Sequence, residues 1–149
     1  MSVVVRTIAR IIVPMILAFG AYVIMHGHLT PGGGFQGGAV IASAIALLLV
    51  VFGSGRLAGY KNLLSLVEDL GAIAFVALAF LGIGCTFFSN VLAGSGGLFG
   101  MPVPPGPNPG FLNTGGTLPL MNWAVGLKVA AGLGSVVLLL GLFGGGDDR

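Results

Sequence analysis

The sequence predicts an all-α membrane protein with four transmembrane helices. Hydrophobic residues make up 56% of its 149 positions and charged residues only 7%, and the mean hydropathy is +1.07. Soluble domains carry about 25% charged residues, so this chain has too little polar surface to face water on all sides. It also contains four apolar segments, each close to the ~20 residues that cross a bilayer as a helix.

The four apolar segments are predicted to form one domain that covers residues 1–149. The predicted helices span residues 8–25, 38–52, 70–88 and 118–143. The first segment follows Arg6 and Arg10 as a signal peptide would, but no cleavage pattern of small residues comes after it. We therefore expect a retained helix.

The positions of Lys and Arg predict the orientation in the membrane. The positive charges that flank the spans all fall on one side of a four-span arrangement: Arg6, Arg10, Arg56, Lys61 and Arg149. The positive-inside rule then places both termini in the cytoplasm. The long Pro/Gly-rich connection at 89–118 carries no charge and is predicted to lie outside. It is expected to rest against other protein, with a flexible linker as the alternative.

The stretch HGHLTPGGGFQGG, residues 26–38, joins the first two spans. Gly32, Gly34 and Gly37 match a dinucleotide-binding pattern, but that motif needs a preceding strand and a later acidic residue, and both are missing here. Glycines also let the backbone turn sharply and approach another helix. The stretch is either a tight buried turn or part of an ion path, and its composition favours the turn.

Two histidines, His26 and His28, stand at the end of the first span. A cation there is favoured by the helix dipole, and histidine also exchanges protons near neutral pH. We favour capping over a proton relay. Glu68 and Asp69 precede the third predicted span, where acidic groups suit the first turn of a helix, and we prefer that interpretation for Asp69.

Lys128 is the residue that packing alone explains least well. It lies about ten residues into the fourth span, ~15 Å from the outer end. A lysine near the bilayer middle costs about 2.5 to 3.5 kcal/mol on insertion scales and marks a functional site by default. Glu68 and Asp69 are expected ~20 Å away along the membrane normal. We therefore predict that Lys128 is paired by another subunit.

Enzymatic and nucleic-acid roles lack the residues that they need. The sequence offers no nucleophile with a base, no paired carboxylates within the membrane and no cysteine set for a metal cluster. Six Lys/Arg against four Asp/Glu are too sparse to track phosphates. We expect no bound cofactor, no metal, no nucleic acid and no small-molecule substrate.

The glycine stretch resembles the MnhB/MrpB family, a four-helix subunit of Mrp-type Na+/H+ antiporters. The matching residues follow the pattern GH-x2-PGGGFQGG: Gly27, His28, Pro31, Gly32, Gly33, Gly34, Phe35, Gly37 and Gly38. The span pattern extends the resemblance over nearly the whole chain. One departure is Lys128, because the antiporter subunits carry an acidic residue near that position. The lysine is more similar to archaeal versions of the module.

The resemblance implies an accessory subunit of an ion-translocating complex in the cell membrane, surrounded by lipid and other membrane subunits. Na+ and H+ would be the transported ions, with Lys128, His28, His26 and Glu68 as candidates for the ion path. The same module occurs in archaeal membrane-bound hydrogenases and sulfur-reducing complexes. The alternative is a purely structural subunit that joins larger membrane proteins.

Overall fold

The computed structural model describes residues 2–105 and 110–144, and in these residues all regular structure is helical. The elements are α1 (Val3–His26), α2 (Gly34–Phe52), α3 (Ser54–Leu57), the 3-10 turn η1 (Ala58–Tyr60), α4 (Lys61–Phe80) and α5 (Leu118–Phe143). Four helices, with α3 and η1 extending α4, are long and apolar enough to cross a membrane. The predicted all-α class with four such helices is confirmed.

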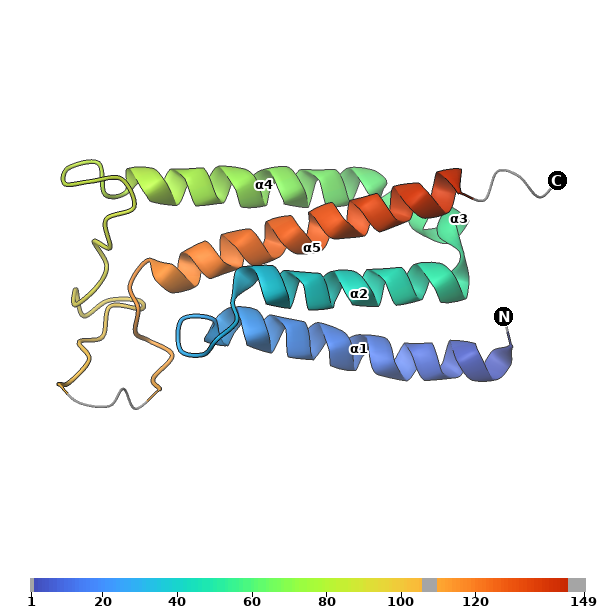
Figure 1. Ribbon diagram of the computed structural model, residues 1–149, viewed down its shortest axis with the longest axis horizontal. Coiled ribbons are helices and arrows are strands. Elements are labelled where there is room, and N and C mark those ends of the chain that lie inside the picture. The colour runs from blue at the N-terminus through green and yellow to red at the C-terminus, as the bar shows by residue number, and fades with distance from the viewer. Residues whose placement is uncertain (1, 106–109, 145–149) are drawn as a thin grey trace.

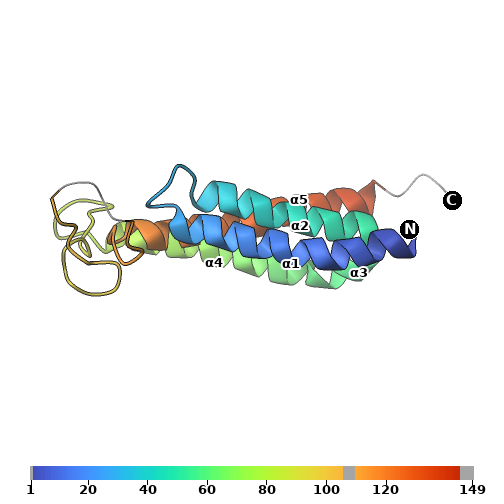
Figure 2. The same ribbon diagram turned by 90° about the horizontal axis from the view of Figure 1, so that it is seen from below.

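The long helices form a row in the order α1, α2, α5, α4 (Figure 1). Turned by 90°, the same helices overlap in a thinner layer (Figure 2). The start of α1, the end of α5 and the short helix α3 lie at one end, while the α1–α2 turn and the segment before α5 lie at the other. Glycine and alanine dominate the contacts, so most large apolar side chains point outward.

Small residues set the spacing between neighbouring helices. A methyl group added at Gly38 of α2 would lie 2.7 Å from the Gly126 carbonyl oxygen of α5. One added at Gly37 would lie 2.7 Å from the Gly20 carbonyl oxygen of α1. Membrane helices associate through close backbone approach of this kind, since lipid supplies no hydrophobic driving force between them. Two more glycines of α5, Gly126 and Gly134, pack closely against Ile24 of α1 and Ile45 of α2.

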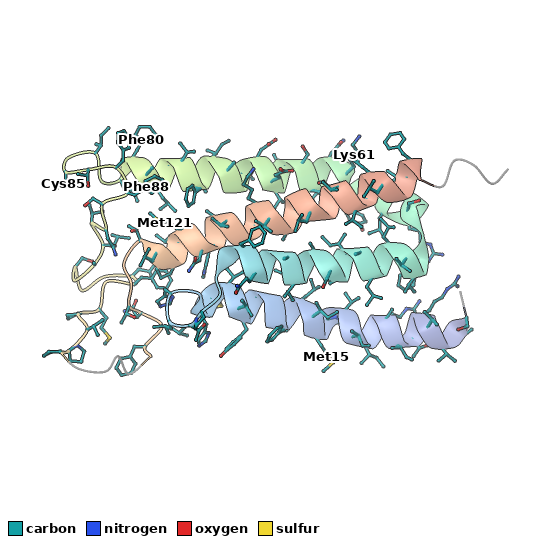
Figure 3. The ribbon with its side chains drawn as sticks, in the orientation of Figure 1. Met15, Lys61, Phe80, Cys85, Phe88 and Met121 are labelled. Carbon is teal, nitrogen blue, oxygen red and sulfur yellow. The ribbon has the colours of Figure 1, made fainter. Side chains whose placement is uncertain are left out.

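The third span differs most from its predicted range, 70–88. Helix α4 begins at Lys61 and ends at Phe80, so it lies closer to the α3 end of the row, and residues 81–88 form turns. Figure 3 shows Lys61 and Phe80 at opposite ends of α4, with Cys85 beyond it and Phe88 back beside its end. Gly82 packs against Ser89 where the chain turns back. The polar residues before Leu70 belong to the helix, although their composition is typical of a loop.

The remaining spans begin earlier than predicted or coincide with the prediction. Helix α1 starts at Val3 because the Ser2 hydroxyl accepts a hydrogen bond from the Val5 amide, a normal N-cap. Helix α2 starts at Gly34, inside the glycine stretch. Helix α5 has the predicted range. The tail with Arg149 lies outside the described residues.

Candidate functional site

An ion pair joins α4 to α5 within the helix row. Lys128 Nζ lies 3.7 Å from Glu68 Oε1. Two glycines make room for the pair. A methyl group at Gly71 of α4 would lie 2.8 Å from the Lys128 backbone nitrogen, and one at Gly132 of α5 would lie 3.2 Å from Glu68 Oε1. Gly71 thus lies against the backbone of Lys128 and Gly132 against the carboxylate of Glu68, which lets the two helices meet there.

The prediction that Lys128 has no partner in its own chain is wrong. It assumed that Glu68 stands at the cytoplasmic start of the third span, ~20 Å from the lysine. Because α4 begins at Lys61, Glu68 is two turns inside the helix. Glu68 and Lys128 then lie at similar depth, and the lysine is paired within the chain.

The pair is neither deeply buried nor tightly bonded. The exposed fractions of the Lys128 and Glu68 side chains are 49% and 36%. Their separation of 3.7 Å exceeds normal hydrogen-bond length, so the two groups attract each other without a direct hydrogen bond. Lysine at this depth costs about 2.5 to 3.5 kcal/mol on insertion scales, so the exposed part of the pair must face protein or water.

Asp69 does not occupy the first turn of a helix, contrary to our interpretation of the sequence. Helix α4 has no acidic residue in its first turn, and Asp69 lies two turns inside it. Its side chain is exposed, and Lys128–Glu68 is the one ion pair found among residues 2–105 and 110–144. Asp69 is therefore a second carboxylate at membrane depth.

The glycine stretch forms a compact turn beside the start of α5. Gly32 has φ +124, which glycine adopts without strain. Gly34 faces the backbone of Asn122 and Gly126, and a methyl group at Gly34 would lie 2.9 Å from the Gly126 nitrogen. Phe35 is 64% exposed and Pro31 is also exposed. The turn thus brings backbone against α5 and leaves Phe35 and Pro31 exposed.

Asn122 is a candidate that sequence reasoning missed. Methyl groups at Gly27 and Gly33 would lie 2.8 Å from its Nδ2 and 3.0 Å from its Oδ1, so the amide sits within the glycine turn. The available signal was its position six residues before Lys128 on a helix of otherwise apolar character. Asn122 and Gln36 help line an open groove of about 440 Å³ beside Gly32–Gly34.

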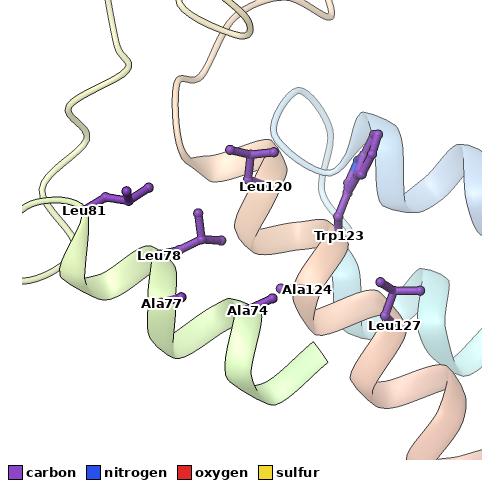
Figure 4. A pocket seen from close by; sticks show the side chains of 8 residues that line it. All are labelled: Ala74, Ala77, Leu78, Leu81, Leu120, Trp123, Ala124 and Leu127. Carbon is purple, nitrogen blue, oxygen red and sulfur yellow. The ribbon is translucent and has the colours of Figure 1, made fainter. Parts of the chain in front are cut away.

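Most polar side chains on or against α5 lie near Val125. Val125 lines both the groove beside the glycine turn and a second groove that is apolar apart from Lys128, and we call this region the polar face. On the other side, Trp123 and Leu127 line two apolar grooves. Figure 4 shows the larger, about 440 Å³, between α4 and α5. The polar face is defined by Gln36, Glu68, Asn122 and Lys128 together with the Gly32–Gly34 turn.

The two histidines lie at the end of α1, away from the ion pair along the row. His26 stacks on Tyr22 with ring centres 4.2 Å apart, and its Nδ1 is enclosed without a hydrogen bond. The His26 carbonyl accepts hydrogen bonds from the amides of Leu29 and Thr30. Backbone groups therefore cap this helix end.

His28 packs against the connection that precedes α5. A methyl group at Gly115 would lie 3.0 Å from its ring, and both ring nitrogens are enclosed without a hydrogen bond. Burial lowers the pKa of His28 below its usual 6.5, and His26 adds to this effect. The carbonyls of Leu112 and Met25 oppose it. The neutral ring is favoured, which suits packing better than a cationic cap.

The connection before α5 is held by Asn90. Its Nδ2 donates to the Gly115 carbonyl at 3.0 Å, and its Oδ1 accepts from the Thr117 amide at 2.8 Å and the Thr117 hydroxyl at 3.1 Å. Thr117 is the buried N-cap residue of α5. The segment is thus bonded to the helix that carries Lys128. Within the described part of the chain, no three His, Cys, Asp or Glu side chains gather as a metal site would require.

Comparisons with known proteins agree with the glycine motif. The family model described as "Domain related to MnhB subunit of Na+/H+ antiporter" matches residues 4–135. An uncharacterized protein of Methanocaldococcus jannaschii is 38% identical over 129 residues, 85% of this chain and 47% of that protein.

Putative antiporter subunits mnhB2 of Staphylococcus haemolyticus and Staphylococcus aureus (strain Newman) match a shorter stretch. They are 47% and 46% identical over 51 residues, which are 34% of this chain and 36% of each relative. The chain thus spans about half, or less, of the length of these curated relatives.

Proposed function

This chain belongs to the MnhB family, and from that premise we propose that it is a non-catalytic subunit of an Mrp-type cation/proton antiporter that helps form a Na+ or H+ path. It is a multi-pass protein of the cell membrane. The observation that carries the proposal is the half-exposed Lys128–Glu68 pair on the polar face. Membership of the family implies other membrane subunits, and one of them would cover this face.

The pair could work by exchanging partners. A carboxylate binds either a proton or Na+, and the ammonium of Lys128 competes with both for Glu68. At 3.7 Å the two groups are close enough to attract each other but not locked by a hydrogen bond. An ion that arrives at Glu68 would release Lys128 toward a covering subunit, and departure of the ion would restore the pair. Such an exchange couples ion position to side-chain position.

The experiment is ion transport by the assembled complex in everted membrane vesicles. We expect Lys128→Met to lower Na+-driven proton movement at least tenfold while the subunit stays in the complex. Leu127→Met is the matched control. Leu127 is next to Lys128 in the sequence, but its side chain lies on the apolar side of α5. Wild-type transport by Lys128→Met would contradict the proposal.

A purely structural role is the second candidate. The glycine contacts that fix α2 and α4 against α5 favour it, since a rigid row of helices could join larger subunits without moving ions. The two roles differ over the ion pair. A joining subunit needs the pair only for stability, whereas a path subunit needs its charges for transport.

The complex is a standalone antiporter or the membrane arm of an archaeal hydrogenase or sulfur-reducing system. Proteins that co-purify with the subunit in mild detergent decide between them. Iron–sulfur or nickel subunits would identify the redox version, and their absence from an otherwise intact antiporter would identify the standalone one.

A further inference from the structure

Helix α4 ends the row, so one of its sides packs on α5 and another is left uncovered (Figure 1). Six exposed residues, spaced three or four positions apart, form a stripe on this uncovered side. We call this stripe the α4 edge: Asn62, Ser65, Asp69, Ile73, Val76 and Phe80. Its first half is polar and its second half apolar.

Helix α1, at the opposite end of the row, shows what an ordinary lipid-facing stripe looks like. Its exposed residues at the same spacing carry no charge: Val4, Ile8, Ile11, Met15, Phe19 and Tyr22. The α4 edge thus carries a carboxylate, Asp69, that the α1 stripe lacks. Lipid is a suitable neighbour for the α1 stripe but a poor one for the α4 edge.

Asp69 lies deep in the membrane span. It is eleven residues, about 16 Å, from the end of α4 at Phe80, and it follows Glu68, which pairs with Lys128. Within the part of the chain that the structure describes, no Lys, Arg or His forms an ion pair with Asp69. A carboxylate at this depth faces protein or water rather than hydrocarbon.

A groove for an apolar partner begins one turn beyond Asp69. It measures about 400 Å³ and is lined by Ala72, Ile73, Val76, Ala77 and Phe80. Ile73, Val76 and Phe80 run along the groove with Ala72 and Ala77 on either side, so its lining is wholly apolar. A negative charge followed along one stripe by an apolar groove matches a helix that is apolar at one end and basic nearer its middle.

We propose that the α4 edge docks a transmembrane helix of another subunit, and that this helix presents a Lys, Arg or His side chain to Asp69. The inference rests on the proposed membership of a multi-subunit complex. It does not depend on Lys128, because the ion pair with Glu68 lies between α4 and α5 rather than on the α4 edge.

The test measures how much of this subunit remains when the complex is purified through a tag on another subunit. Asp69→Leu should lower the retained amount at least tenfold, since the partner's cation would be left without a counter-charge in the membrane. Asp69→Lys should lower it further by placing like charges together. Tyr22→Leu, which removes the polar group of the α1 stripe, is the matched control and should leave retention unchanged.

Two further measurements separate docking from misfolding and from lipid contact. The purified Asp69→Leu chain should keep wild-type helix content and thermal midpoint in detergent. A spin label at Ile73→Cys, in a Cys85→Ser background, should be immobilised and shielded from oxygen in the complex, while one at Met15→Cys should be mobile and accessible.

Undiminished retention of Asp69→Leu overturns the proposal, whether or not transport is lost, because Asp69 would then face lipid or an aqueous path. Equal oxygen access at Ile73 and Met15 overturns it as well. Neither result bears on the proposed ion path, which the Lys128 and Glu68 variants test separately.

Discussion

Glu68 Oε1 lies 3.7 Å from Lys128 Nζ because α4 starts at Lys61 and carries the glutamate into the membrane. The pair neutralises a lysine that hydrocarbon would not accept, yet its two side chains remain partly exposed on the polar face. An ion pair in that position either holds α4 against α5 or takes part in ion movement.

The α2–α5 contact should fail when Gly34 gains a side chain. A methyl group there meets the backbone of Asn122 and Gly126, and backbone cannot move aside as a flexible side chain could. Overpacking of this kind costs about 1–3 kcal/mol, so Gly34→Ala should lower the thermal midpoint in detergent. Gly55→Ala is the control, since nothing lies within 4 Å of that position, and its midpoint should not fall. Equal midpoints would show that α2 and α5 are not held together there.

The orientation can be tested with impermeant maleimide on intact cells. Cys85 is exposed in the segment after α4 and should react from outside unless a partner subunit covers it. Ser54→Cys in a Cys85→Ser background should react only after the cells are opened, because Arg56 and Lys61 mark that end as cytoplasmic. Labelling of Ser54→Cys in intact cells would reverse the topology.

The sequence was sufficient to predict the four long helices but not the ion pair. Long apolar runs identify membrane spans directly, because hydrocarbon selects for them. Glu68 and Asp69 break such a run, so the start of the third span was placed after them. Glu68 is tolerated inside α4 because Lys128 pairs with it, and that contact joins residues far apart in the sequence.

The glycine stretch was likewise predicted only in part. Its composition predicts a close turn, and Gly34 and Gly38 do approach the α5 backbone. The sequence could not identify Asn122 as the partner of the turn, because the direction in which an α5 side chain points depends on how the helices cross. Likewise, Asn90 gave no sign of its bonds to Thr117 and Gly115, which only the folded connection brings together.

His28 should make the fold sensitive to mild acid. Its pKa is lowered by burial, so between the lowered value and 6.5 the unfolded chain binds more protons than the folded one. Stability then rises with pH across this window: the contribution is complete above about pH 6.5 and is lost as the pH falls toward the lowered pKa. The thermal midpoint should therefore drop between pH 7.5 and 5.5, and His28→Phe should reduce the drop. If the thermal midpoint of His28→Phe falls as much as that of the wild type, another titrating group is responsible.

The most direct test of the central claim is a double-variant cycle on Lys128→Met and Glu68→Gln in the assembled complex, with retention and transport measured together. Each single variant leaves one charge uncompensated, and the double variant removes both. We expect all three variants to be retained in the complex as the wild type is, and the double variant to transport at least tenfold below wild type. Wild-type transport by the double variant would show that the pair serves only to hold α4 against α5.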